Sequence, residues 1–199
     1  MSLNIDYYNR NAQAFIDSSI DADVRDLYDK FLPDIPAGGR ILDAGCGAGR
    51  DTLAFRGLGY LVDAFDASEE MVKYSRSLTD VDVKLDTFMS FDSETDYDGI
   101  WACASLLHVP RTELASTIKK LFTHLKDGGL FYFSMKLGDG ERRVNGRTFT
   151  DFSIENIADL IKDIDKITLR GFWITNDVRP ERSDQWINVI LAKQLQPNG

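Results

Sequence analysis

The chain has 199 residues, of which 43% are hydrophobic and 28% are charged, as expected of one globular domain with an apolar core. Its formal net charge of −9 argues against a surface that binds nucleic acid through non-specific phosphate contacts. No stretch reaches the roughly 18 apolar residues of a membrane helix, and we expect no signal peptide at the start. The two cysteines, Cys46 and Cys103, are expected as free thiols, which suits a cytoplasmic protein.

Strands and helices alternate through the first two thirds of the chain. Apolar residues at helical spacing predict helices over 6–15, 24–32, 51–58, 69–78, 113–125 and 153–162. Apolar or alternating runs predict strands over 40–44, 60–65, 81–85, 99–104, 130–135, 166–175 and 186–193. The alternation is typical of an α/β doubly wound, mostly parallel sheet with helices on both faces. The loop between the last two strands is too irregular for a crossover helix, so we expect an antiparallel hairpin at one edge.

A glycine-rich loop joins the first predicted strand to the helix after it. Residues 41–50 read ILDAGCGAGR, with the spacing G-x-G-x-G and with Asp43 two positions before the first glycine. Glycines let a backbone turn sharply close to a ligand, and the following helix presents free N–H groups there. A βα turn that binds nothing would also fit these residues. The G-x-G-x-x-G spacing of dinucleotide-binding proteins is absent, which disfavours an NAD-dependent dehydrogenase.

An acidic residue follows the second predicted strand. Asp66 stands about 20 residues past the glycines, where a carboxylate can accept hydrogen bonds from both hydroxyls of a ribose. The alternative is a surface aspartate that caps the next helix. Ser68 stands at the N-cap position of that helix.

These residues resemble motif I and the next acidic position of the class I S-adenosylmethionine-dependent methyltransferases, whose motif I is a hydrophobic pair followed by D/E-x-G-x-G-x-G. The resemblance covers most of the chain, from about residue 6 to residue 193. It is nearest to the small tellurite-resistance-type branch, methyltransferase types 11 and 12. It implies the Rossmann-like seven-stranded fold, S-adenosylmethionine as cofactor, S-adenosylhomocysteine as product, and direct displacement at the methyl carbon.

The resemblance also implies where the cofactor binds. Asp43 would organise the loop and reach the methionine amino group, and Asp66 would hold the ribose. Met71 would pack on the adenine, although a role in the core remains open. The adenine amino group would be bound by Asp86 or by the backbone at 87–88. The expected cofactor-binding residues are Tyr8, Asp43, Gly45, Cys46, Gly47, Arg50, Asp66, Ala67, Met71, Asp86, Thr87, Phe88, Cys103 and Ala104.

The segment after the fourth predicted strand is expected to face the acceptor. His108, one of two histidines, stands where many small-molecule methyltransferases carry a histidine, so it is our candidate catalytic residue, as a general base. A histidine that only orders the loop is the alternative. Residues 104–107 read ASLL, without the Asn/Asp-Pro-Pro-Tyr/Phe run of amino-methyltransferases that modify nucleic-acid bases. Cys103 lacks the preceding proline of the cytosine-C5 enzymes, and we expect no metal site.

We expect one methyltransferase domain over 1–199, with a helical lid over about 1–35, a cofactor-binding core over 40–136, and an acceptor-side segment with the terminal strands over 137–193. Six basic residues fall beside the open end of the sheet: Lys136, Arg142, Arg143, Arg147, Arg179 and Arg182. They suggest a small anionic acceptor as partner. A solvated loop with its own carboxylate partners is the alternative. An RNA or protein methyltransferase, or a non-catalytic S-adenosylmethionine-binding module, also stays open, and the sequence indicates no oligomeric state.

Overall fold

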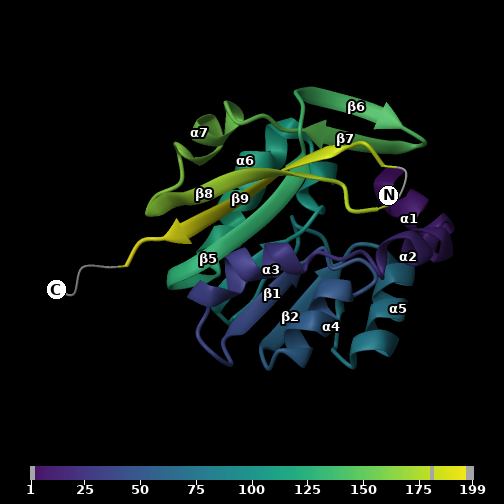
Figure 1. Cartoon of the computed structure of the whole chain (residues 1–199), viewed down its shortest axis with the longest axis horizontal. Helices are drawn as coiled ribbons and strands as arrows, with labels where there is room; N and C mark the ends of the chain where they lie inside the picture. Colours follow the sequence, from purple (N-terminus) through teal and green to yellow (C-terminus); the bar gives the residue numbers. More distant parts are fainter. Residues whose placement is uncertain (1–2, 180–181, 196–199) are drawn as a thin grey trace.

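A seven-stranded sheet with the strand order β3-β2-β1-β4-β5-β9-β8 forms the centre of the molecule (Figure 1). The computed structural model describes residues 3–179 and 182–195. Its strands are β1 (Arg40–Ala44), β2 (Leu61–Asp66), β3 (Lys84–Leu85), β4 (Tyr97–Ala102), β5 (Leu125–Lys136), β8 (Ile167–Asn176) and β9 (Gln185–Lys193). The pairs from β3 to β5 are parallel, whereas β9 pairs antiparallel with both β5 and β8. The predicted fold class, with its antiparallel hairpin at one edge, is therefore confirmed.

Helices cover both faces of this sheet. They are α1 (Leu3–Arg10), α2 (Ala12–Ser19), α3 (Arg25–Phe31), α4 (Arg50–Gly57), α5 (Glu69–Thr79), α6 (Arg111–Thr123) and α7 (Asn156–Ile161), with 3-10 turns at Leu32–Asp34 and Leu106–His108. Phe31 of α3 and Phe55 of α4 pack with Trp101 and Tyr132 on one face. The apolar residues of α6 and α7 pack on the other. Because both faces are covered, most residues of the central strands β1 and β4 are apolar and buried. No helix in the described ranges has the length and hydropathy to span a membrane.

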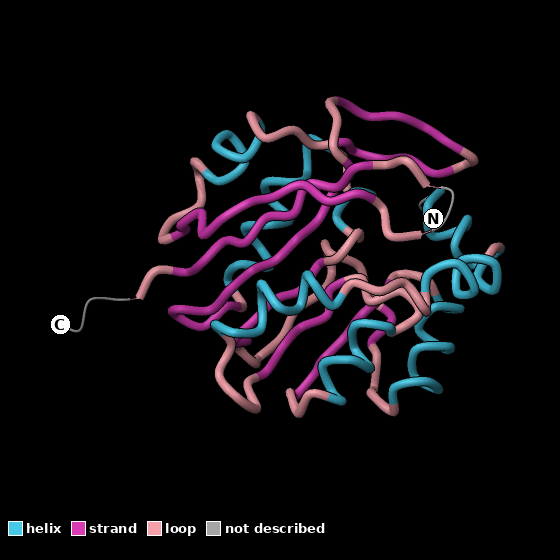
Figure 2. Tube along the Cα trace, viewed as in Figure 1, coloured by secondary structure: helices cyan, strands magenta, loops and turns pink. Residues whose placement is uncertain are grey.

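The helices α1 and α2 lie beside the carboxyl ends of the parallel strands, next to α5 (Figures 1 and 2). We expected one helix over 6–15, and the structure breaks it at Asn11, whose φ of −116° and ψ of 24° are not helical. The side-chain amide of Asn11 donates to the Tyr7 carbonyl at 2.8 Å. Asparagine competes in this way with the helical hydrogen bonds, which explains the break.

A second small sheet, made of β6 (Gly140–Val144) and β7 (Arg147–Asp151), stands above these helices (Figure 1). No strand was expected in this part of the chain. The sequence does carry a hairpin signal here, the dipeptide Asn145-Gly146. Both residues have positive φ, at +52° and +81°, as a two-residue type I′ hairpin turn requires. The hairpin places β7 against α1: the side-chain oxygen of Asn4 accepts from the Thr148 amide at 2.8 Å.

Several boundaries also differ from the prediction, most clearly at three elements. The third strand is two residues long instead of five, because Val83 donates to the Val81 carbonyl and turns the chain before it. The fifth strand begins at Leu125, so that 126–129 lie within it and do not end the preceding helix. The helix expected from Ser153 begins at Asn156, whose side-chain oxygen accepts from the Ser153 amide at 3.1 Å.

Candidate functional site

Two cavities meet at the carboxyl ends of β1, β2 and β4. Tyr8, Phe15, Gly45, Gly47, Ala104 and His108 line both. The β2-side cavity is further lined by Phe65, Asp66, Ala67, Ser68, Met71, Asp86, Thr87 and Phe88, among others. The β5-side cavity is further lined by Cys46, Arg50, Asp51, Cys103, Lys136, Arg147, Phe149, Asp177, Arg179, Arg182 and Trp186, among others. In an open α/β sheet, ligands bind at this edge.

The glycine loop forms the floor between the cavities. The amides of Gly45 and Cys46 both donate to the Phe65 carbonyl, at 2.9 and 3.0 Å, which fastens the loop to β2. Gly45 has φ of +76°, and a Cβ there would lie 2.7 Å from the Cβ of Ser105. Gly47 also has positive φ, at +54°. Glycine is therefore needed for both conformation and space at Gly45, and the bare backbone faces the cavity.

Asp66 ends β2 and is held by the same loop. One carboxylate oxygen accepts from the Gly47 amide at 2.9 Å, and the other accepts from the Ser68 amide at 2.8 Å. Burial raises the pKa of Asp66, while these backbone hydrogen bonds lower it. Each carboxylate oxygen can accept a second hydrogen bond, so the group can still bind a pair of hydroxyls. Ser68 caps α5 as predicted, since its hydroxyl accepts from the Met71 amide at 3.3 Å.

Asp43 lies beneath the loop and does not line either cavity as described. It is 2% exposed, and one of its oxygens accepts from the Thr52 hydroxyl at 2.6 Å. Burial, reinforced by the charge of Asp51, raises the pKa of Asp43 to about 8. The contact ties β1 to α4 and organises the loop. A direct role of Asp43 in ligand binding stays a prediction.

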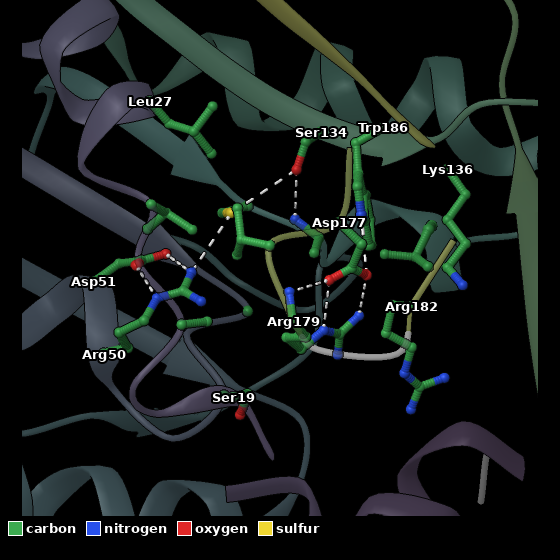
Figure 3. A pocket seen from close by; sticks show the side chains of 18 of the residues that line it. Ser19, Leu27, Arg50, Asp51, Ser134, Lys136, Asp177, Arg179, Arg182 and Trp186 are labelled. Atoms are coloured by element: carbon green, nitrogen blue, oxygen red, sulfur yellow. Dashed lines mark hydrogen bonds and ion pairs between the residues drawn. The ribbon is translucent and has the colours of Figure 1, made fainter. Parts of the chain in front are cut away.

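The Arg50 guanidinium is fixed on one side of the β5-side cavity by Asp51 (Figure 3). Asp51 accepts from Arg50 at 2.6 and 2.9 Å, from the Tyr28 hydroxyl at 2.6 Å and from the Trp101 indole at 2.8 Å. Burial alone would raise the pKa of Asp51. The charge and hydrogen bonds of Arg50 outweigh burial and hold this pKa below its usual value. Sequence reasoning missed this four-donor cluster, because its partners come from three separate elements.

The chain is strained just after β4, where it passes between the cavities. Ala104 has φ of +52°, which residues with a Cβ rarely adopt, and its amide donates to the Ser134 hydroxyl at 2.9 Å. Cys103 lies beside it, 3.7 Å from an Arg50 nitrogen. Burial raises the pKa of the Cys103 thiol to about 12, so the group is neutral and is no nucleophile.

Aromatic and apolar side chains wall the β2-side cavity. Phe88 contacts Phe65 with ring centroids 5.4 Å apart, and Asp86 accepts from the Thr87 amide at 2.8 Å. Met71 lines the cavity but is 1% exposed and packs with Ile16. It therefore belongs to the core and to the cavity wall at once. The expected residues on this side are brought together.

Tyr8 and His108 form a hydrogen-bonded pair where the cavities join. The Tyr8 hydroxyl lies 2.8 Å from Nε2 of His108, and Nδ1 lies 3.0 Å from the Thr148 carbonyl. Since a carbonyl only accepts, Nδ1 carries the proton and Nε2 accepts from Tyr8. Burial, together with the charges of Arg147 and Lys136, lowers the pKa of His108 to about 4, although the hydrogen bond to Thr148 acts in the opposite direction. His108 is therefore neutral at pH 7.

Four of the six basic residues expected near the acceptor line the β5-side cavity: Lys136, Arg147, Arg179 and Arg182. Arg179 pairs with Asp177 at 2.5 Å, and Lys136 pairs with Asp184 at 2.6 Å. Arg142 pairs with Asp151 outside the cavity, and Arg143 does not line it. Figure 3 shows Lys136, Arg179, Arg182 and Trp186 on the other side of the cavity from Arg50. Within the described residues, five basic and two acidic side chains line this cavity. No group of three or more His, Cys, Asp or Glu residues could hold a metal ion in the described part of the chain.

One protein family, described as "Methyltransferase domain", matches residues 10–172. A protein from Staphylococcus carnosus (strain TM300), named an uncharacterized methyltransferase, is 25% identical over 145 residues, which are 64% of this chain and 70% of that protein. A ubiquinone biosynthesis O-methyltransferase from Xanthomonas axonopodis pv. citri (strain 306) is 32% identical over 106 residues, which are 50% of this chain and 44% of that protein. The match therefore spans less than half of the Xanthomonas enzyme.

A solved structure shares the fold over almost the whole chain. The 1,6-didemethyltoxoflavin-N1-methyltransferase of Burkholderia thailandensis, with 1,6-didemethyltoxoflavin and S-adenosylhomocysteine bound, aligns with a TM-score of 0.76 at 20% identity. The alignment covers 96% of this chain and 85% of that one. At this identity the likeness establishes the fold.

Proposed function

The chain belongs to the methyltransferase-domain family, and on that premise we propose that it transfers the methyl group of S-adenosylmethionine to a small, anionic acceptor. The observation that carries the proposal is the pair of cavities joined at the glycine loop. One holds the carboxylate of Asp66 among apolar walls, and the other is lined by an excess of basic side chains.

The residues of the β2-side cavity fit the adenosyl part of the cofactor. Asp66 keeps free acceptor positions for the two ribose hydroxyls, and Ala67, Met71 and Phe88 offer apolar surface to a purine. Asp86 and Thr87 stand where the purine amino group would be bound. The methionine part would cross the loop at Gly45 and Gly47 to reach Arg50, because a cation there suits its carboxylate. Tyr8, Cys46, Cys103 and Ala104 line the crossing.

S-adenosylmethionine supplies a methyl group on a positively charged sulfur, which leaves as a neutral thioether when an acceptor lone pair attacks the methyl carbon. The protein contributes placement and exclusion of water, which together are worth roughly 7–11 kcal/mol. Tyr8 and Phe15 lie between the two cavities and are positioned to restrict water.

His108 is the proposed proton acceptor when the acceptor group carries a proton. Its Nδ1–H is fixed by the Thr148 carbonyl, so only Nε2 is basic, and that atom lies at the junction of the cavities. The acceptor proton would pass to Nε2 in place of the hydrogen bond that Tyr8 now donates. The acceptor atom would be oxygen, nitrogen, sulfur or a metalloid oxyanion.

A small acceptor is supported by the relatives as well. The Burkholderia protein is named for the methylation of 1,6-didemethyltoxoflavin, and the Xanthomonas protein for ubiquinone biosynthesis. The net charge of −9 disfavours an RNA acceptor. The free thiols of Cys46 and Cys103 support a cytoplasmic location.

Calorimetric titration with S-adenosylmethionine, S-adenosylhomocysteine and NAD in parallel tests the cofactor. We expect both adenosyl ligands to bind and NAD to give no heat. If neither S-adenosylmethionine nor S-adenosylhomocysteine binds, the proposal is overturned. Adenosyl binding without turnover in a screen of small anions and thiols would favour the non-catalytic binding module.

A further inference from the structure

Arg147 differs from the other basic residues of the β5-side cavity in how its guanidinium is surrounded. It begins β7, and its guanidinium carbon lies 4.4 Å from the Tyr7 ring centroid and 5.0 Å from that of Phe149. Its Nε is buried without a hydrogen-bond partner. No carboxylate pairs with it within the described ranges.

The neighbouring cations are satisfied in other ways. Arg50, Lys136 and Arg179 each pair with an aspartate. Arg182 is exposed, so water can solvate it. A buried donor without a partner is costly, and more so when it carries charge. Arg147 is therefore the partly buried basic group of this cavity that no carboxylate of the described residues neutralises.

Resting on the proposed function, we propose that Arg147 binds a carboxylate of the acceptor, and that this acceptor is a small aromatic carboxylate held in the β5-side cavity. A guanidinium presents a planar fork of donors that matches a carboxylate. Four aromatic side chains are among the residues that line this cavity: Tyr8, Phe15, Phe149 and Trp186. A planar ring fits such walls better than a tetrahedral inorganic anion, which has no apolar surface to bury.

The position of Arg147 also couples anion binding to His108. Its guanidinium lies 5.9 Å from the Tyr8 ring centroid, and Tyr8 is the hydrogen-bond partner of His108. The charged groups that face His108 are Arg147 from β7 and Lys136 from β5, and both lower its pKa. A carboxylate on Arg147 would offset one of these charges. The acceptor would thus raise the basicity of the nitrogen that takes its proton.

The test uses benzoate as probe, benzamide as its neutral counterpart, and inorganic phosphate as the tetrahedral anion. Each is titrated by calorimetry into the full chain with S-adenosylhomocysteine present. Arg147→Gln removes the charge and the fork. Arg143→Gln is the matched control, because Arg143 lies on the same hairpin, is exposed, and does not line the cavity. If Arg147→Gln does not fold, Arg147→Lys takes its place, because lysine keeps the positive charge but lacks the planar fork of donors.

We expect benzoate to bind more tightly than benzamide and phosphate. Arg147→Gln should weaken benzoate binding by about tenfold or more, while Arg143→Gln changes it less than about twofold. Equal binding of benzoate by wild type and Arg147→Gln, or tighter binding of phosphate, would overturn the inference. If the wild type does not bind S-adenosylhomocysteine at all, the proposed function itself is overturned.

An NMR titration of the imidazole signals tests the coupling separately. The chain has two histidines, so His108→Gln assigns the His108 signal. Benzoate should raise the pKa of His108 in the wild type. In Arg147→Gln that pKa should be raised already, and benzoate should not move it further. A His108 titration that is the same in both proteins, with and without benzoate, would overturn the coupling.

Discussion

The Tyr8 hydroxyl lies 2.8 Å from Nε2 of His108, and through this contact the N-terminal helix α1 reaches the end of β4. Two further contacts hold the same helix. Asn4 bonds to the backbone of Thr148, and Asn9 accepts from the Ser68 hydroxyl at 2.7 Å. The helix therefore bridges the β6–β7 hairpin and the start of α5, above the junction of the cavities.

Tyr8→Phe should loosen this bridge. The variant keeps the ring but leaves Nε2 of the half-buried His108 without its donor, so we expect a loss of about 1 kcal/mol in the free energy of unfolding. Hydrogen–deuterium exchange should speed up in α1 before it does in α6. Tyr60→Phe is the control, since Tyr60 precedes β2 on another part of the molecule. Unchanged exchange in α1 would contradict the bridging role.

Asp66→Ala should abolish measurable binding of S-adenosylmethionine without unfolding the protein. The carboxylate is the proposed partner of both ribose hydroxyls, and losing two charge-assisted hydrogen bonds corresponds to more than about 100-fold in affinity. Asp63→Ala is the matched control, because Asp63 lies on the same strand and forms a half-exposed ion pair with Arg40. Calorimetry gives the affinities and circular dichroism monitors folding. An affinity like that of wild type would refute the ribose assignment.

Gly45→Ala should lower stability and cofactor affinity together. The added Cβ would meet the Ser105 Cβ at 2.7 Å, at a φ of +76° that alanine rarely adopts. We expect a cost of about 1–3 kcal/mol in a urea unfolding curve. Gly57→Ala is the control, because no atom lies within 4 Å of its Cβ position and its φ is not positive. That helical substitution should be neutral or stabilising by up to about 1 kcal/mol. Similar unfolding curves for both variants would contradict this account.

Acid should destabilise the protein through His108. The pKa of His108 is lowered from 6.5 to about 4 by burial, so between these values the unfolded chain binds the proton and the folded chain does not. Stability from this group is thus fully present above pH 6.5 and is lost as the pH falls to about 4. Between pH 7 and pH 5 the loss is about 2 kcal/mol. His108→Gln should lack this part of the pH dependence in urea unfolding, and an identical slope in both proteins would show that His108 is not buried in neutral form.

Features that are local in sequence could be predicted. The alternation of strands and helices predicted the mostly parallel sheet, and the first strand was predicted with its observed bounds, Arg40–Ala44. The Gly45 turn and the Ser68 cap follow from neighbouring residues, and both are confirmed in geometry. The methyltransferase family is confirmed as well, and the cofactor belongs to the proposed function. The roles of the individual site residues stay predictions.

Features that depend on distant partners could not be predicted. The four donors to Asp51 come from positions 28, 50 and 101, and no local pattern links them. The pairing of Arg142 with Asp151, which removes it from the cavity, depends on the β6–β7 hairpin. In the sequence nothing distinguishes Arg147 from the other arginines expected near the acceptor. In the structure its guanidinium contacts the rings of Tyr7 and Phe149.

The contact between Gly45 and Ser105 has a consequence for evolution. The Ser105 hydroxyl donates to the Ala44 carbonyl at 2.7 Å, and its Cβ fills the space that a side chain at position 45 would need. A side chain at position 45 would therefore meet Ser105, although 60 residues separate the two positions. Relatives that diverge in the choice of acceptor can exchange residues along the β5-side cavity one at a time, whereas a side chain at position 45 should appear only together with a glycine at position 105.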